Sequence, residues 1–90
     1  RHYKVAAQIK VEDLDKGSFV CLQLAFRDTY HGWFEDTLDA PKGQLFEEQT
    51  GWIEDVVEAD APEGASSVEL RVMIVGKGAV SVRRVMMLRT

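Results

Sequence analysis

The sequence predicts an all-β fold, an antiparallel β-sandwich formed by residues 1–90 as a single domain. Three observations lead to this prediction. Apolar and polar residues alternate in several short segments, as they do in strands that bury one face. Turn residues separate these segments, and no segment keeps the spacing of an amphipathic helix. Finally, ninety residues are enough for only one small hydrophobic core.

The first strand is expected over residues 3–11. Apolar side chains occupy every second position, namely Tyr3, Val5, Ala7, Ile9 and Val11. Most residues between them are polar, so one face of the strand should lie against the core and the other against solvent. A polar loop over residues 12–17 follows and ends at Gly17.

The second strand begins at Ser18 and carries an apolar stripe at even positions: Val20, Leu22, Leu24 and Phe26. Its odd positions, which include Phe19, Cys21 and Gln23, carry a mixture of apolar and polar residues rather than a row of charged ones. We therefore expect the second face of this strand to be covered as well, by a loop, a second chain or a ligand groove.

Residues 28–42 form a long connection without a clear period, and Pro41-Lys42-Gly43 ends it. A connection of this length in a small domain usually has a function. Residues 45–49 are then expected to form a short edge strand, with Glu47 and Glu48 turned to water.

Three further strands are expected between residues 52 and 88. An extended run begins at Trp52, and turn residues at 61–64 and 76–78 separate it from two more strands. The middle strand carries its apolar residues at even positions: Val68, Leu70, Val72 and Ile74. Trp52 is expected to lie in the core, because its strand has apolar partners.

The last strand contains a change of parity. Val80 and Val82 lie on one parity, and Val85 and Met87 lie on the other. A β-bulge at residues 83–84 would direct both pairs inward. The alternative is a regular strand in which Met86 and Leu88 continue the even apolar stripe, and Val85 and Met87 face a second covered surface.

Taken in order, these segments resemble the C-terminal portion of jelly-roll carbohydrate-binding modules of the galactose-binding-domain-like superfamily. The resemblance rests on YKVAAQIKV, FVCLQLAFRD, TGW and APEGASSVELRVMIVGKGAVSV, and it runs from Tyr3 to Leu88. It implies a jelly-roll-like sandwich that lacks the N-terminal strands of its relatives and leaves sheet edges open. Either this chain belongs to a longer protein, or a second copy completes the sandwich.

The resemblance fails at Arg83-Arg84, where such modules usually carry an acidic pair often tied to a structural calcium site. An arginine side chain has no acceptor for calcium, so no metal site is expected here. His2 and His31 are too few and too far apart for another metal site. No cofactor motif is present.

Five residues are the candidates for ligand binding. Tyr30, Trp33 and Phe34 lie in the long connection, and an aromatic plane can stack on the apolar face of a sugar ring. Gln23 and Arg71 lie on the parity that faces away from the core and could donate hydrogen bonds to sugar hydroxyls. In the alternative interpretation, the aromatic residues cover an open sandwich end, and Gln23 and Arg71 are ordinary outward-facing polar residues.

Composition and charge argue against several other classes. The net charge is −4 and no basic stripe occurs, which argues against nucleic acid and anionic membranes as partners. Cys21 is the single cysteine, so no internal disulfide forms. Adjacent acids such as Glu47 and Glu48 point to opposite faces of a strand, so no catalytic carboxylate pair is expected, and we predict that the domain is not an enzyme.

The sequence thus supports two function hypotheses. The first is a non-catalytic carbohydrate-binding module that tethers a larger, secreted or periplasmic bacterial enzyme to a polysaccharide, although no signal peptide occurs in this chain. The alternative is a structural or protein-interaction sandwich, such as a homodimer joined through open edges or through the surface of Phe19, Cys21, Met73 and Val75.

Overall fold

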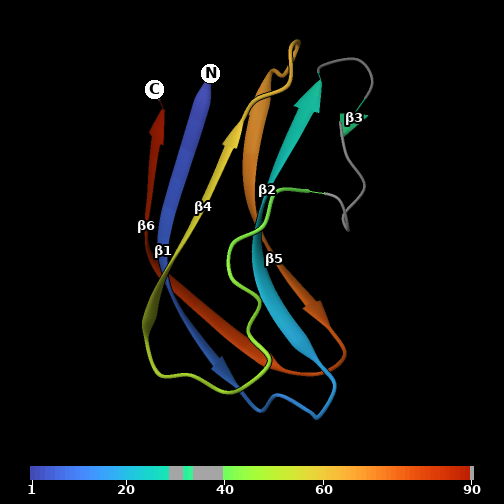
Figure 1. The fold of residues 1–90 in the computed structure, drawn as a ribbon, viewed down its shortest axis with the longest axis vertical. Helices are drawn as coiled ribbons and strands as arrows, with labels where there is room; N and C mark the ends of the chain where they lie inside the picture. Colours follow the sequence, from blue (N-terminus) through green and yellow to red (C-terminus); the bar gives the residue numbers. More distant parts are fainter. Residues whose placement is uncertain (29–31, 34–39, 90) are drawn as a thin grey trace.

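The fold of the chain is a sandwich of two antiparallel sheets (Figure 1). The structure is a computed structural model that describes residues 1–28, 32–33 and 40–89, with only the backbone at Gly32 and Trp33. Its elements are β1 (His2–Glu12), β2 (Phe19–Asp28), β3 (Gly32–Trp33), β4 (Ile53–Asp60), β5 (Ser67–Val75) and β6 (Ala79–Arg89). The prediction of an all-β, antiparallel sandwich is confirmed.

Among the described residues, each sheet contains three strands. Sheet A has the order β4-β1-β6, and sheet B has the order β3-β2-β5. All neighbouring strands run antiparallel. The tight turn between β5 and β6 carries the chain from one sheet to the other. Its Gly76 has a φ of 95°, and a side chain there would collide with the Ser18 hydroxyl, so glycine is required twice over.

The core lies between the two sheets and follows the predicted periods. The inward residues of β1 are the odd-numbered Val5, Ala7, Ile9 and Val11, and those of β2 are the even-numbered Val20, Leu22, Leu24 and Phe26. Val57 of β4 and Phe46 complete the buried cluster. Both apolar stripes predicted from the sequence are therefore correct.

The outer face of β2 is buried too, as its mixed composition predicted. Cys21 and Ala25 are buried on this face, and Gln23 between them is 1% exposed. Met73 of β5 lies opposite Cys21 and is also buried. Cys21 and Met73 are thus buried within a single chain, whereas Phe19 is partly exposed and Val75 is 39% exposed, so a homodimer through this surface stays a prediction.

Residues 41–46 run beside β2 without forming a regular strand. Two isolated bridges join Lys42 to Gln23 and Phe46 to Val20. The edge strand expected over residues 45–49 is therefore reduced to a single bridge at Phe46, while Glu47 and Glu48 are exposed as expected.

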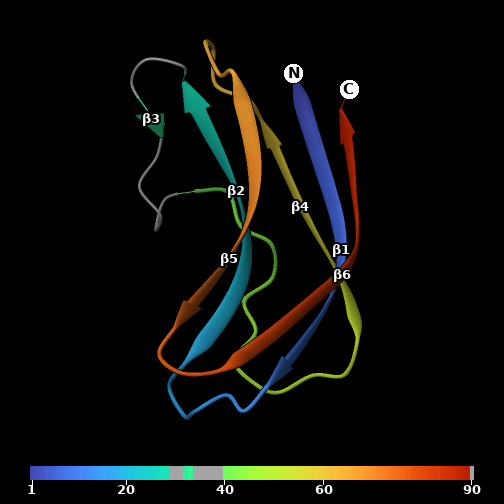
Figure 2. The ribbon, with the colours of Figure 1, turned by 180° about the vertical axis from the view of Figure 1, so that it is seen from behind.

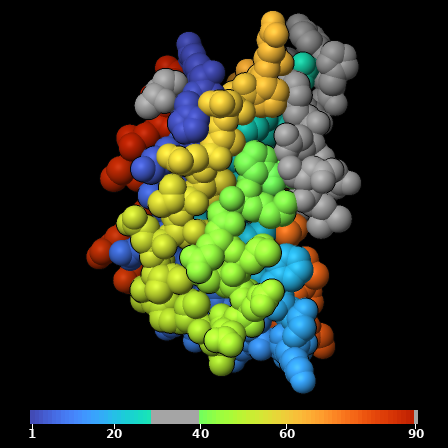
Figure 3. All heavy atoms as spheres, in the orientation of Figure 1, coloured from blue at the N-terminus to red at the C-terminus, as the bar shows by residue number. Residues whose placement is uncertain are grey.

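A buried carboxylate fixes this segment to β4, beside which it lies in Figure 3. Asp55 lies opposite Ala7 and points inward, where its Oδ1 accepts a hydrogen bond of 3.2 Å from the Gln44 backbone N–H. A side chain at Gly43 would collide with the same carboxylate. Glycine at position 43 lets the loop backbone approach Asp55 closely.

The predicted β-bulge is present in β6. Opposite β1, the register shifts so that Arg84 and Val85 together face the single residue Ala7. Arg84 adopts a φ of 53°, the left-handed region that side chains other than glycine adopt at a cost.

As predicted, the bulge changes which positions of β6 face inward, from even-numbered residues before it to odd-numbered residues after it. The residues that follow the bulge are nevertheless exposed. Val82 pairs with Ile9 and Met87 pairs with Val5, so both lie on the inward face. Val82 packs against the core, whereas Val85 and Met87 are 53% and 41% exposed. The expected burial of Val85 and Met87 is therefore wrong, because in the part of the chain that the structure describes nothing covers this half of β6.

Trp52 lies outside the core, contrary to expectation. It precedes β4, on the parity of Glu54 and Glu58 rather than that of the inward Val57, and it is 37% exposed. The guanidinium of Arg83 stacks 3.9 Å from the centroid of its ring. Trp52 therefore forms a cation–π contact on the outer face of sheet A.

Candidate ligand cleft

The predicted aromatic site lies largely outside the described residues. Tyr30 and Phe34 both fall there, so their predicted role stays a prediction. Trp33 belongs to β3, whose backbone pairs with the end of β2 so that Trp33 lies opposite Arg27. The structure thus places the backbone of Trp33 at the end of the sandwich where β2 terminates.

The structure brings Gln23 and Arg71 together, opposite one another in the β2–β5 ladder. The amide Nε2 of Gln23 donates to the sulfur of Met73 at 3.5 Å, and the Nε of Arg71 lies 3.9 Å from a carboxylate oxygen of Glu69. Because Gln23 is 1% exposed, its amide does not reach the surface, and only the partly exposed Arg71 is accessible to a ligand.

A cleft of about 510 Å³ opens at the same end of the sandwich as β3. Its walls come from the start of β1, the ends of β2 and β6, and the turn between β4 and β5. The lining residues are Arg1, Tyr3, Phe26, Ala61, Pro62, Glu63, Ala65, Ser66, Ser67 and Arg89. In Figure 1 this is the upper end of the molecule, where the labels N and C lie.

An aromatic pair joins the two sheets at this cleft. The ring centroids of Tyr3 and Phe26 lie 5.9 Å apart with the planes tilted by 57°. Phe26 is buried, and Tyr3 is partly exposed. Tyr3 can therefore offer part of its ring and its hydroxyl group to a ligand while Phe26 supports it from the core.

Polar groups surround the aromatic pair. Arg89 lies directly opposite Tyr3 in the β1–β6 ladder, and both Arg89 and Arg1 are exposed. The hydroxyl of Ser66 donates to the Arg27 carbonyl oxygen at 3.0 Å, which holds the turn against β2. The cleft thus combines one accessible aromatic ring with guanidinium and hydroxyl donors and the carboxylate of Glu63.

The sequence does not reveal this cleft, because its residues come from four separate segments. Tyr3 reads as an ordinary member of the first apolar stripe, and Arg89 as a polar residue after the last strand. They become neighbours only through the register that the bulge in β6 sets. The one available signal was the β4–β5 turn, whose Pro62 and Gly64 mark a loop at a sandwich end.

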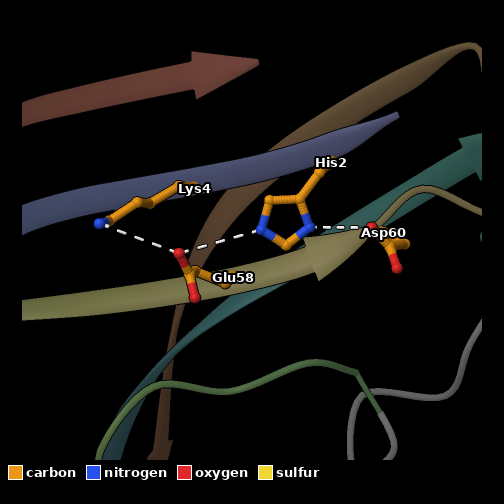
Figure 4. Close-up of polar contacts among 4 residues, drawn as sticks. All are labelled: His2, Lys4, Glu58 and Asp60. Atoms are coloured by element: carbon orange, nitrogen blue, oxygen red, sulfur yellow. Dashed lines mark hydrogen bonds and ion pairs between the residues drawn. The ribbon is translucent and has the colours of Figure 1, made fainter. Parts of the chain in front are cut away.

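A second polar cluster lies on the outer face of sheet A (Figure 4). Nδ1 of His2 lies 2.8 Å from Oδ1 of Asp60, and Nε2 of His2 lies 3.9 Å from Oε1 of Glu58. Nζ of Lys4 lies 3.9 Å from the same Glu58 oxygen. All four side chains are well exposed, so we interpret the cluster as surface ion pairing worth about 0–1 kcal/mol.

In the described part of the chain, no group of three or more His, Cys, Asp or Glu residues could hold a metal ion. Over the same residues, no helix is long and apolar enough to cross a lipid bilayer.

Comparison with protein-family models, curated proteins and solved structures returned no match. The resemblance to jelly-roll carbohydrate-binding modules therefore rests on the sequence motifs alone, and the fold and the cleft have to be interpreted from their own geometry.

Proposed function

We propose that this domain is a non-catalytic carbohydrate-binding module and that the cleft at the end of the sandwich is its site. The observation that carries the proposal is the composition of the cleft, in which the Tyr3 ring lies among guanidinium and hydroxyl groups. A sugar ring presents both an apolar C–H face and hydroxyl groups, and this combination recognises both. In a longer extracytoplasmic protein, such a module would hold a catalytic partner domain on its polysaccharide.

The position of β3 supports the same site. Trp33 pairs with Arg27, and Arg27 in turn lies opposite Ser67, which lines the cleft. The backbone of Trp33 thus lies near the cleft, which supports including the predicted aromatic residues in the proposed site. We propose that Trp33, with Tyr30 and Phe34, extends the aromatic surface that Tyr3 begins, while Arg71 remains a donor on the neighbouring sheet face.

Affinity electrophoresis of the chain through gels that contain a panel of soluble polysaccharides tests this proposal. We expect at least one polysaccharide to retard the chain, and Arg89→Ala and Trp33→Ala each to weaken that retardation about tenfold. Arg89 is exposed, so its removal should leave the fold intact.

Trp52→Ala is the matched control, because Trp52 is an exposed tryptophan at the far end of β4 from the cleft. It should leave retardation unchanged. If no polysaccharide retards the wild-type chain, or if all three variants behave alike, the cleft is not a glycan site.

A second candidate function is that of a protein-interaction sandwich. It is favoured by one specific observation, the exposed apolar side chains along β5 and β6.

A further inference from the structure

Exposed apolar side chains gather along β5 and β6. Figure 2 shows these two strands diverging from the turn that joins them. We call the exposed residues the β6 patch: Val72, Ile74, Val75, Val85, Met86, Met87 and Leu88. Their exposed fractions lie between 39% and 61%.

Part of the β6 patch belongs to the inner layer of the sandwich. Val72 and Ile74 lie opposite Leu22 and Val20, which are fully buried core residues of β2. Directly opposed residues on neighbouring strands share one face of the sheet. The side chains of Val72 and Ile74 therefore face inward, as Met87 does in sheet A, and yet each is 41% exposed. As far as the described residues go, the sandwich is open along this side.

β6 combines the position of an edge strand with the composition of an interior strand. Among the described residues, β6 pairs with β1 alone, so its other edge offers backbone groups without a strand partner. Residues 85–88 are four consecutive apolar side chains, which makes both faces of the strand apolar. Edge strands in proteins usually carry charges or are short, whereas strands apolar on both faces are usually covered.

The charge of this region indicates what kind of strand fits beside it. No acidic residue occurs between Leu70 and Thr90, but five of the eleven basic residues do: Arg71, Lys77, Arg83, Arg84 and Arg89. β4, at the opposite edge of sheet A, carries four acids and no base. Two copies joined symmetrically through β6 would bring arginines against arginines, which is unfavourable.

We propose that the free edge of β6 binds an extended peptide segment from outside these ninety residues, with an apolar centre and acidic flanks. The segment would add a strand to sheet A through backbone hydrogen bonds. Its inward side chains would cover Val72, Ile74 and Met87, and its acidic ends would meet Arg84 and Arg89. Arg89 also lines the proposed glycan cleft, but this inference does not depend on that site, because its test uses Arg84, which does not line the cleft.

The test uses a short fluorescent peptide in which valine alternates with threonine between acidic ends, and a second peptide in which lysines replace the acids. Fluorescence anisotropy should show saturable binding of the acidic peptide to the chain at low salt. Arg84→Asp should weaken that binding at least about threefold and should strengthen binding of the basic peptide. Aspartate tolerates the left-handed backbone at this position, so the variant should keep its fold.

Lys16→Asp, in the exposed turn before β2, is the control of equal charge change and should leave both affinities unchanged. Hydrogen exchange of the complex should show new protection in β6. The proposal is overturned if the acidic peptide does not bind, if Arg84→Asp and Lys16→Asp act alike, or if protection appears elsewhere. It is also overturned if sedimentation shows a dimer that Arg84→Asp abolishes, because the occupant would then be a second copy.

Discussion

At the scale of single residues, the polar groups buried in this small domain set the clearest constraints. Asp55 is buried, and its Oδ2 has no hydrogen-bond partner among the described residues, while Oδ1 binds the Gln44 backbone. Cys21 lies on the outer face of β2, close enough to Asp55 and Lys42 to interact with both charges. Substitutions of Asp55 or Cys21 should therefore change the stability of the domain through the desolvation of these groups as much as through the contacts that they make.

The stability of the domain should decrease at high pH because of Cys21. Burial raises the pKa of the Cys21 thiol; the Lys42 ammonium opposes this, and the Asp55 carboxylate adds to it. Above about pH 8.5, the usual pKa of cysteine, the unfolded chain loses this proton before the folded chain does. The free energy of unfolding should therefore fall by up to about 1.4 kcal/mol per pH unit until the raised pKa is reached.

Urea unfolding at a series of pH values measures this slope. Cys21→Ala should remove it, so the difference between the two curves isolates the contribution of the thiol. Parallel curves for the two proteins across the alkaline range would contradict the prediction.

At the scale of elements, the bulge in β6 determines which side chains of the last strand lie on the inward face of sheet A. It brings Val82 and Met87 onto one face, although they differ in parity, and it places Arg89 opposite Tyr3 at the cleft. The cost is concentrated at Arg84, with its φ of 53°.

Arg84→Gly should stabilise the domain by about 0.5–1 kcal/mol, because glycine adopts a positive φ without steric cost. Arg84→Val should destabilise it by about 1 kcal/mol or more, since a β-branched side chain fits this backbone poorly. Equilibrium unfolding in urea measures both changes. Equal effects of the two substitutions would mean that the backbone conformation of Arg84 does not control stability.

At the scale of the whole molecule, the sequence was sufficient for the sheets but not for the cleft. The alternation in β1 and β2 predicted which residues are buried, because a half-buried strand has a period of two. Even the bulge was visible as a change of parity between Val82 and Val85.

The alternation of apolar and polar residues could not predict which residues of strands distant in sequence become neighbours. The Tyr3–Arg89 neighbourhood depends on register across 86 positions of chain, and no local pattern encodes it. Trp52 shows a different limit, since the apolar residues of its strand suggested the core although its parity matched Glu54 and Glu58. In that case the period of two was the better guide to burial than the apolar neighbours.

The β6 patch should contribute little to the stability of the isolated chain. Met86→Gln and Leu88→Gln should each change the free energy of unfolding by no more than about 0.5 kcal/mol, because both side chains are already more than half exposed. Val57→Ala, at a fully buried position of the same sheet, should cost about 1–3 kcal/mol. Losses of similar size for all three in urea unfolding would show that the patch is covered in solution.

Sheet A has one further property that follows from its two edges. With acids along β4 and arginines along β6, the charge changes sign across the width of the sheet, and the domain carries an electric dipole that lies across its strands. In physiological salt, the field of such a dipole extends over about 8 Å. A charged surface or chain within this distance would orient the molecule before the two make contact. A negatively charged partner would then contact the β6 edge first.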